Sequence, residues 1–389
     1  MKILLDGFNL SLRHGTGLST YTRELSEVLS ANGNSVSCLF GLEGVKSDEL
    51  VRWASFVQSI NLGKDSSNIK NKRFLFKLIS YLPSYILRRP LQLAKVERVK
   101  EVSQLGVSKN LDSFTTLYNK EFIFKISQAY TFFTERPLKL SLPVNEGVDI
   151  FHCTSPIPIY MEGAKNVVTV HDLIPISLPH STQVDLRHYA NMIRASLKKA
   201  DAISVISQYT KNELINFFNV PEEKIFVTYQ SAEVPKDIEE IPDEDLSRFL
   251  KQNYNLNIKN YFLYYGAIEP KKNVDKIINA TLLCQNDFPI VIAGKDGWLY
   301  AGVNEQLERL NDKKKFRRIK YLPRKDLMML LKGAKALVFP SLHEGFGLPV
   351  LEALNMGTPV ITSSLTSLAE VGGDAVLYVD PLNEADIAQ

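Results

Sequence analysis

The chain has 389 residues, of which 45% are hydrophobic and 23% are charged, and its formal net charge is +3. This composition is ordinary for a globular protein and excludes a wholly disordered chain, a collagen and a coiled-coil rod, while the length predicts two or three domains. No apolar run reaches the roughly 18 residues that span a bilayer. Asp6 interrupts the N-terminal segment before a signal-peptide core could form, so we do not expect secretion.

The three cysteines, Cys38, Cys153 and Cys284, are odd in number and far apart. They fit neither a disulfide framework nor the spacing of metal ligands. We therefore expect reduced thiols in a cytoplasmic protein.

The small net charge hides an uneven distribution. Residues 46–145 contain 17 Lys and Arg against 8 Asp and Glu, a balance of +9, so the rest of the chain carries −6 against the total of +3. Such an asymmetry requires an explanation.

The first half of the chain begins with a β-α-β pattern, which is typical of a parallel doubly wound sheet. The alternation is lost from about 45 to 145, which we interpret as an insertion, and it then resumes. The expected strands lie over 2–6, 36–40, 148–153, 166–171, 202–206 and 225–229, and the expected helices over 21–31, 183–199 and 209–218.

The second half alternates more clearly, with near-continuous apolar strands of the kind found in a sheet covered on both faces. The expected strands lie over 261–266, 289–293, 318–322, 336–340, 359–362 and 375–379, with helices over 273–284, 303–311, 325–334 and 349–356. The sequence thus predicts an α/β protein with two Rossmann-like domains, residues 1–234 and 260–389. A polar linker with a short helical piece joins them over 235–259. We expect the ligand site in the cleft where these domains face each other.

The strongest motif is Glu344-Gly-Phe-Gly-Leu-Pro-Val-Leu-Glu352, between a strand and the next helix. Gly345 and Gly347 permit close backbone approach, and the amides of the following helix suit a phosphate. The two carboxylates lie too far apart along the chain to form an adjacent acid/base pair, but they could hold two ends of an extended ligand. A capping acid with a solvated helix acid explains the spacing equally well.

Three further segments are candidates for binding chemistry. In Glu269-Pro-Lys271-Lys272-Asn, two lysines precede a helix, an arrangement that is costly unless an anion joins it; a solvated loop with a lysine–Glu269 pair is the alternative. His171 follows a strand and could donate a hydrogen bond to a substrate hydroxyl, although a lone histidine is more often structural. Gly15-Thr16-Gly17 is a weak phosphate-loop signal.

The sequence gives little support to a metal site. Asp243-Glu-Asp245 has the form of a metal-binding Asp-x-Asp, but no strand places it at an active site. No cluster of Cys and His indicates zinc, and no Gly-x-Ser-x-Gly elbow indicates a hydrolase.

The basic insertion contains an amphipathic segment, Arg73–Leu82, with Leu75, Leu78, Ile79 and Leu82 on one face. Arg73 and Lys77 lie opposite, and Arg88 and Arg89 follow Pro83. Basic residues next to apolar ones suit an anionic membrane surface. A helical excursion with a solvated basic face is the alternative.

Together these motifs resemble the retaining glycosyltransferases of family 4, which have the GT-B fold. The matching stretches are GTG at 15–17, VTVHDLIP at 168–175, YGAIEPKKN at 265–273, FPSLHEGFGLPVLEALNMGTPVI at 339–361 and LAEVGGDAVLYVDP at 368–381. The resemblance covers most of the chain except about 45–145. Within the family, the sequence looks like bacterial O-antigen or capsule mannosyl- and rhamnosyl-type transferases.

The resemblance implies roles for individual residues. Glu352 would hold the ribose of a nucleotide sugar, Glu344 and His171 would contact the donor sugar, and Lys272 would stabilise the departing diphosphate. Gly17 and the backbone at Gly345, Phe346, Gly347 and Leu348 would lie against the same phosphates. No divalent metal or other cofactor is expected, and no nucleic acid.

Two departures from the family pattern stand out. Many relatives have an arginine after the glycine that corresponds to Gly266, where this chain has Ala267, so Lys271 or Arg324 would assist Lys272. The family also continues beyond Gln389 with further helices, so we expect a truncated C-terminal domain.

The expected function is therefore retaining, metal-independent hexosyl transfer from a nucleotide sugar, with GDP-mannose favoured. The acceptor would be a glycan or lipid-linked glycan in surface polysaccharide synthesis, reached from the cytoplasmic side with peripheral contact to the membrane. Two alternatives remain open: a GT-B nucleotide-sugar epimerase, and a non-catalytic nucleotide-sugar-binding partner subunit. A dehydrogenase is disfavoured because neither half carries a full dinucleotide fingerprint.

Overall fold

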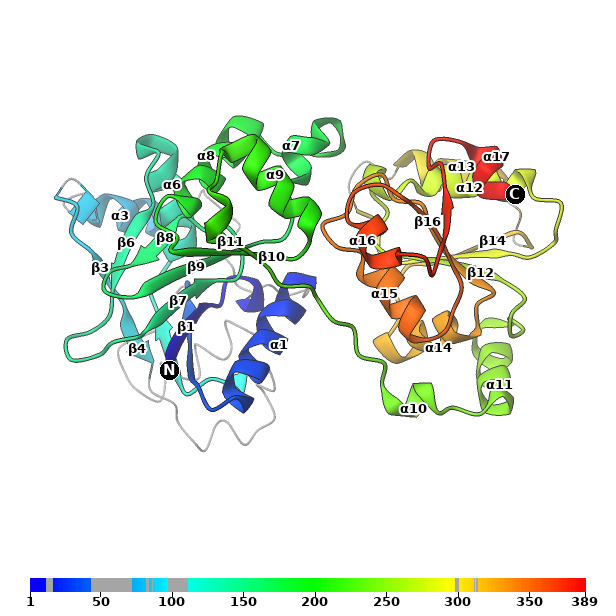
Figure 1. Cartoon of the computed structure of the whole chain (residues 1–389), viewed down its shortest axis with the longest axis horizontal. Helices are drawn as coiled ribbons and strands as arrows, with labels where there is room; N and C mark the ends of the chain where they lie inside the picture. The colour runs from blue at the N-terminus through cyan, green and yellow to red at the C-terminus, as the bar shows by residue number, and fades with distance from the viewer. Residues whose placement is uncertain are drawn as a thin grey trace. The chain divides into compact units, whose positions relative to one another are not determined.

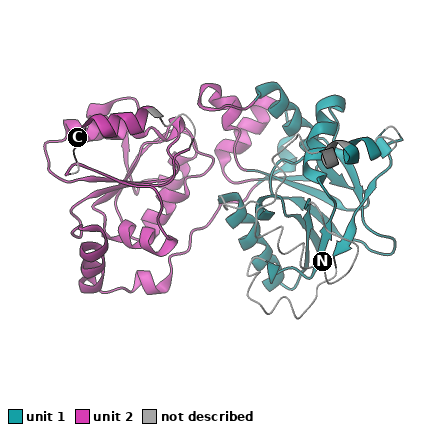
Figure 2. Cartoon of the chain, turned by 180° about the vertical axis from the view of Figure 1, so that it is seen from behind, with its two compact units in different colours: residues 1–170, 185–204, 218–226 teal, residues 171–184, 205–217, 227–389 magenta. Residues whose placement is uncertain are grey.

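A computed structural model describes residues 1–11, 17–42, 72–81, 84–85, 87–96, 111–297, 301–310, 312 and 314–389. These residues form two compact units, each built on a mainly parallel sheet (Figure 1). Unit 1 comprises Met1–Val170, Asp185–Ser204 and Phe218–Phe226, and unit 2 comprises His171–Val184, Val205–Phe217 and Val227–Gln389 (Figure 2).

The first sheet has eight strands in the order β11-β10-β9-β7-β1-β2-β5-β4. Strand β1 pairs in parallel with β2 and β7, β2 with β5, and β7 with β9, whereas β4 runs antiparallel to β5. The strands are β1 (Lys2–Asp6), β2 (Ser35–Phe40), β4 (Ala94–Val96), β5 (Thr116–Asn119), β7 (Ile150–Cys153), β9 (Lys165–Val170), β10 (Ala202–Val205) and β11 (Ile225–Val227).

A second, three-stranded sheet in the order β3-β6-β8 accompanies it, formed by β3 (Leu91–Gln92), β6 (Leu138–Ser141) and β8 (Ile159–Met161). The helices of this half of the chain are α1 (Gly17–Ala31), α3 (Lys72–Ser80), α6 (Ile123–Thr134), α7 (Ile174–Ser177), α8 (Leu186–Leu197) and α9 (Gln208–Phe218). The described elements of the basic insertion, among them α3 and β3–β6, therefore lie within unit 1.

The sheet of unit 2 has six parallel strands in the order β14-β13-β12-β15-β16-β17. Counted from β12, this is the 3-2-1-4-5-6 order of a dinucleotide-binding Rossmann sheet. The strands are β12 (Phe262–Tyr265), β13 (Ile290–Ala293), β14 (Phe316–Ile319), β15 (Ala336–Phe339), β16 (Val360–Ser363) and β17 (Leu377–Val379).

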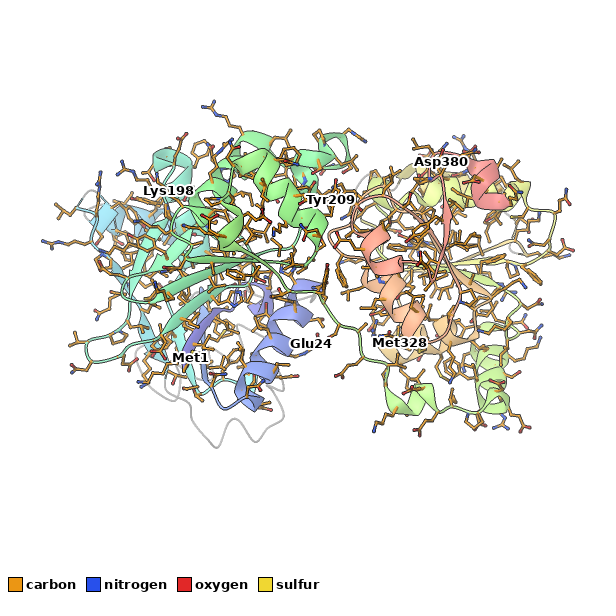
Figure 3. The ribbon with its side chains drawn as sticks, in the orientation of Figure 1. Met1, Glu24, Lys198, Tyr209, Met328 and Asp380 are labelled. Atoms are coloured by element: carbon orange, nitrogen blue, oxygen red, sulfur yellow. The ribbon has the colours of Figure 1, made fainter. Side chains whose placement is uncertain are left out.

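The helices along this part of the chain are α10 (Lys236–Glu239), α11 (Asp243–Tyr254), α12 (Val274–Leu283), α13 (Ala301–Leu310), α14 (Arg324–Gly333), α15 (Leu348–Asn355), α16 (Leu368–Gly372) and α17 (Glu384–Ala388). Strands β12, β13 and β15 supply a continuous apolar core, and α12 and α14 bury one face against it. Met328 of α14, labelled in Figure 3, is among the core residues.

The segment 235–259 differs from the predicted linker. It forms α10 and α11, and Ile238, Leu246 and Leu250 are buried in the core of unit 2. Leu246 and Leu250 lie four positions apart and so share one face of α11, and Phe249 and Tyr254 of the same helix also pack against this core. Within the described ranges, every helix is too short or too polar to cross a lipid bilayer.

Candidate functional site

The two strongest sequence motifs lie side by side in unit 2. The segment after β12 contains Lys271 and Lys272, the segment after β15 contains Glu344, and β12 pairs with β15. The amide of Leu342 donates a hydrogen bond to the carbonyl of Lys271 at 2.8 Å, which joins the two loops directly. Strand order reverses between β12 and β15, and such a reversal is where open α/β sheets bind ligands.

Glu344 and Lys272 form a close ion pair. The Lys272 ammonium donates to Glu344 Oε1 at 2.5 Å, and both side chains are largely buried. The Lys272 Nζ also lies 4.9 Å from the centre of the Phe339 ring. The structure therefore brings together two residues that lie 72 positions apart in the sequence.

The charge state of Glu344 follows from these neighbours. Burial alone would raise the pKa of the Glu344 carboxyl, but the charges of Lys272 and Lys271 outweigh it and hold the pKa below its ordinary value. Glu269 shows the opposite balance, because burial raises its pKa although Lys271 lies 3.9 Å away. Glu344 is thus an ionised carboxylate beside two cations.

Glu352 forms a separate cluster on α15. Arg324 donates to Glu352 Oε1 at 2.5 Å, and the Tyr265 hydroxyl donates to the other carboxylate oxygen. Arg324 opens α14, where a cation opposes the helix dipole unless a carboxylate compensates it. Burial, and next the charge of Glu352, raise the pKa of Tyr265. The two glutamates of the motif therefore have different cations as partners.

Gly345 and Gly347 meet different requirements. A Cβ at Gly345 would lie 2.4 Å from the carbonyl oxygen of His171, so the close approach that the sequence predicted is an approach to the backbone at His171. Gly347 has a φ of 116° and caps α15, which begins at Leu348. The helix thus starts inside the motif, one residue before the predicted start at 349.

Two residues after β16 hold the loop in place. Thr366 accepts a hydrogen bond from the Glu344 amide at 3.1 Å, and the Ser367 hydroxyl donates to the carbonyls of Glu344 and Phe346 at 2.9 and 2.8 Å. Phe346 is buried, with its ring 6.2 Å from that of Tyr229. The backbone around Glu344 is therefore anchored before any ligand is considered.

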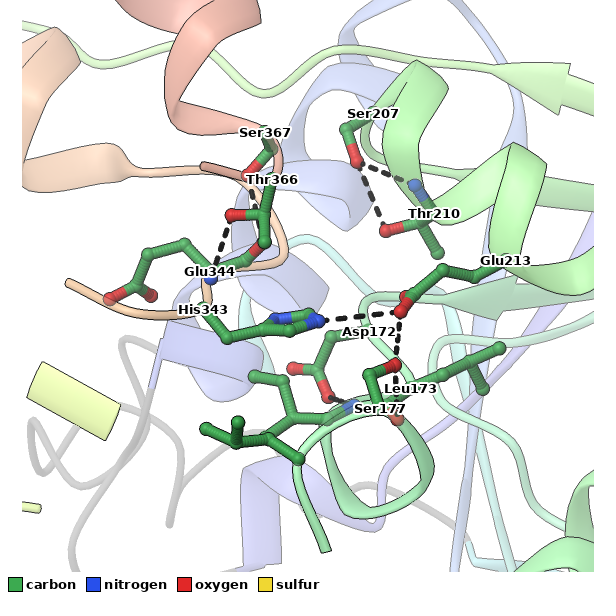
Figure 4. A network of polar contacts seen from close by, with 12 residues as sticks. Asp172, Leu173, Ser177, Ser207, Thr210, Glu213, His343, Glu344, Thr366 and Ser367 are labelled. Atoms are coloured by element: carbon green, nitrogen blue, oxygen red, sulfur yellow. Dashed lines mark hydrogen bonds and ion pairs between the residues drawn. The ribbon is translucent and has the colours of Figure 1, made fainter. Parts of the chain in front are cut away.

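A buried polar network lies next to this loop (Figure 4). His343 Nε2 is 3.3 Å from Glu213 Oε1 of α9, and the same carboxylate oxygen accepts from the Ser177 hydroxyl. His171 is also buried, and its carbonyl accepts from Thr210 at 3.3 Å. These contacts connect segments that contain α7 and most of α9, both of which belong to unit 2.

The remaining predicted residues lie elsewhere. Gly17 opens α1 in unit 1, and a Cβ added there would meet nothing within 4 Å, while Gly15 and Thr16 lie outside the described residues. Asp243 and Asp245 occupy the first turn of α11, where acidic residues favour the helix dipole. Within the described part of the chain, no group of three or more His, Cys, Asp or Glu could hold a metal ion.

Several site residues escaped the sequence analysis. Tyr265 follows the predicted strand pattern and reads as a core residue, although it binds Glu352. Thr366 and Ser367 carry no motif, and their role depends on the pairing of β15 with β16. His343 adjoins Glu344 in the sequence, and that adjacency was the available signal.

Known protein families match both halves of the chain. Residues 247–389 match the sequence model of the glycosyl transferases group 1, and residues 122–231 match that of Glycosyltransferase Family 4. O-antigen chain mannosyltransferase B of Escherichia coli is 36% identical over 227 residues, which are 57% of this chain and 58% of that protein. O-antigen chain mannosyltransferase RfbU of Salmonella typhimurium is 29% identical over 221 residues, with the same coverage.

The chain thus spans somewhat more than half of the length of these relatives. Among solved structures, sucrose-phosphate synthase from Thermosynechococcus elongatus aligns with a TM-score of 0.63 at 15% identity, covering 100% of this chain and 88% of that one. At that identity the likeness establishes the fold, which is the two-domain arrangement of parallel sheets that the sequence predicted.

Proposed function

This chain belongs to the family 4 glycosyltransferases of the GT-B fold, and we propose that it transfers a hexose from a nucleotide-sugar donor with retention of configuration. The acceptor would be a glycan or lipid-linked glycan of a surface polysaccharide. GDP-mannose is the favoured donor, because the two similar proteins are described as O-antigen chain mannosyltransferases.

The observation that carries the proposal is the pair of ionic contacts beside the β12–β15 reversal. Lys272 pairs with Glu344 and Arg324 pairs with Glu352, each at 2.5 Å. A diphosphate entering between these pairs would share the cations with the carboxylates, while a neutral sugar and a ribose each supply hydroxyls that carboxylates accept. The arrangement fits a ligand with a charged centre and two polyhydroxylated ends.

The chemistry would be electrostatic. When the bond between the sugar and the diphosphate breaks, negative charge grows on the leaving group, and Lys272 together with Lys271 would stabilise it. Glu344, held ionised, would face the positive charge that develops on the sugar ring. Arg324 and Glu352 would orient the nucleotide, and the backbone from Gly345 to Leu348 would lie along the phosphates. His171 would donate a hydrogen bond to the sugar.

No divalent metal enters this scheme, so we propose that transfer continues in the presence of EDTA. We also propose that the basic insertion contacts an anionic membrane, where a lipid-linked acceptor would be held. The excess of basic residues over 46–145 supports that contact.

A thermal-shift screen against nucleotide sugars, followed by transfer assays with the stabilising donor, tests the proposal. We expect GDP-mannose to stabilise the protein, and Glu344→Ala or Lys272→Ala to lower transfer at least 100-fold. Glu305→Ala, which removes an exposed carboxylate on α13, is the control and should leave transfer unchanged.

The outcomes separate the alternatives. Donor conversion without acceptor would indicate an epimerase, and binding without any turnover would indicate a partner subunit. Retention is checked by the anomeric configuration of the product. Normal transfer by both the Glu344 and Lys272 variants would refute the site assignment.

A further inference from the structure

Unit 1 contains a cavity whose lining includes no residue of the candidate site in unit 2. Its volume is about 320 Å³, within the range of ligand pockets, and twelve residues line it. Six of the twelve are cations and none is acidic: Arg88, Arg89, Arg136, Lys139, Lys198 and Lys199. We call it the basic cavity.

Separate segments of the chain converge on the basic cavity. Ser84, Tyr85, Arg88 and Arg89 come from the chain after α3, Tyr130 comes from α6, and residues 136–139 lead into β6. Tyr160 lies on β8, and Lys198 and Lys199 follow α8. These elements gather at one end of unit 1 in Figure 1, and Figure 3 labels Lys198 there.

Most of the positive charge in the cavity is uncompensated. Lys139 pairs with Glu162 at 2.5 Å, and the Lys199 ammonium lies 5.7 Å from the centre of the Tyr160 ring. Among the described residues, the other four cations form no ion pair with a carboxylate. Like charges held around a concave surface repel each other and concentrate the field, so an anion bound there would be stabilised.

The aromatic lining adds hydrogen-bonding capacity. Tyr85 packs on Tyr130 with their ring centres 5.1 Å apart. The Tyr85 hydroxyl is buried and has no hydrogen-bond partner among the described residues, which is uncommon for a buried polar group. A phosphate oxygen is an acceptor of the kind it lacks.

Exposed apolar side chains accompany the cavity. Phe133, which is 77% exposed, follows Tyr130 by three positions and so shares its face of α6, and Phe132 beside it is 60% exposed. Leu87, next to Arg88, is 59% exposed. Such side chains gain nothing when a soluble anion binds, but they are stabilised when they enter the hydrocarbon boundary of a membrane.

We propose that the basic cavity binds the phosphate or diphosphate headgroup of a lipid, with Phe132, Phe133 and Leu87 entering the hydrocarbon boundary. This inference rests on the membrane contact proposed above, for which it specifies a ligand and the residues that bind it. It is independent of the sugar-transfer site, which lies in unit 2.

Vesicle binding and pyrophosphate titration test the proposal. The vesicles consist of phosphatidylcholine alone, or with phosphatidylglycerol, or with a polyprenyl diphosphate at matched total charge. We expect binding to rise at least tenfold with the diphosphate lipid over phosphatidylglycerol, and soluble pyrophosphate to compete for it.

The variant Arg88→Ala/Arg136→Ala/Lys198→Ala should lose at least tenfold in affinity for diphosphate vesicles and for pyrophosphate. The control Lys2→Ala/Lys165→Ala/Lys224→Ala removes the same charge from exposed positions of unit 1 and should stay within twofold of the unaltered protein. Both variants should keep the donor-dependent thermal shift, which verifies their folding.

Equal losses in the two triple variants would mean that overall charge drives binding, which refutes the cavity site but leaves the membrane contact standing. Binding of pyrophosphate without preference for diphosphate vesicles would refute the lipid source. Absence of binding to every vesicle would refute the inference and the membrane contact together, while leaving the transfer activity to its own assay.

Discussion

The carboxylate of Glu344 stays ionised although its side chain is buried, because two lysines from another loop lie beside it. Asp6 shows what burial does without such cations. Its carboxylate accepts hydrogen bonds from the Thr154 amide and hydroxyl and from the Phe8 amide, yet burial raises its pKa to about 6. At the scale of single residues, the nearest charges decide the protonation state.

Lys272→Ala should leave Glu344 buried without its main cation. We expect its pKa to rise and the free energy of unfolding at pH 7 to fall by about 3 kcal/mol, the cost of breaking a buried pair. In the double variant Lys272→Ala/Glu344→Gln, part of that loss should return, as measured by urea unfolding. If the loss of unfolding free energy in the double variant equalled the sum of the losses in Lys272→Ala and Glu344→Gln alone, the ion pair would be contradicted.

Asp6→Asn should change the pH dependence of stability. Between an ordinary carboxyl pKa of 3.8 and about 6, the folded protein keeps a proton that the unfolded chain releases, so stability falls as pH rises through this window. The unaltered protein should lose about 3 kcal/mol relative to Asp6→Asn between pH 3.5 and pH 7. The exposed substitution Asp374→Asn should run parallel to the unaltered protein.

At the scale of elements, the close contact of two backbone segments limits which residues fit in the motif loop. The carbonyl of His171 occupies the space that a side chain at Gly345 would need, whereas Gly302 on α13 faces open space. The same residue type therefore serves a packing requirement at one position and none at the other.

Gly345→Ala should destabilise the protein by about 2 kcal/mol through overpacking and should weaken donor binding. Gly302→Ala should instead stabilise it by about 0.5 kcal/mol, because alanine restricts the unfolded chain. Thermal unfolding of the two variants with and without donor measures both effects. Equal stability of the two variants would contradict the contact with His171.

The packing of α11 gives a second test at this scale. Leu250 is fully buried in the core of unit 2, so Leu250→Ala should cost about 3 kcal/mol. Leu282 of α12 is 43% exposed, and Leu282→Ala should cost less than about 0.5 kcal/mol. A small loss at Leu250, measured by urea unfolding, would favour the predicted linker over the docked helix.

At the scale of the whole molecule, the two units carry different surfaces. Unit 2 holds the paired carboxylates and cations of the family motifs, and unit 1 holds the basic cavity. Four of the six cations of the basic cavity come from the basic segment 46–145, and the fold adds Lys198 and Lys199 from outside it.

Donor binding should protect the two units unequally. We expect hydrogen exchange with GDP-mannose to slow at the amides of 265–273 and 341–352, because ligand contacts suppress local opening there. The amides of β1 and β2 in unit 1 should exchange at unchanged rates. Protection confined to unit 1 would contradict the placement of the donor site.

Much of the fold could be read from the sequence. Strand runs such as 336–340 and helix signals such as 349–356 lie within two residues of β15 and α15, because a buried parallel strand and its crossover helix have unmistakable periods. The docking of segment 235–259 could not be read in this way. The sequence predicts a short helix in a polar linker, but the core that buries Leu246 and Leu250 is formed by distant parts of the chain.

The sequence by itself determined the family, the α/β architecture and the motifs, because these depend on local spacing and on apolar runs. Only the tertiary structure decided which groups meet. Lys272 reaches Glu344, Arg324 reaches Glu352, and six cations from segments up to 111 residues apart line one cavity. Sheet order brings distant loops to a common edge, and electrostatic energies depend on those distances rather than on position along the chain.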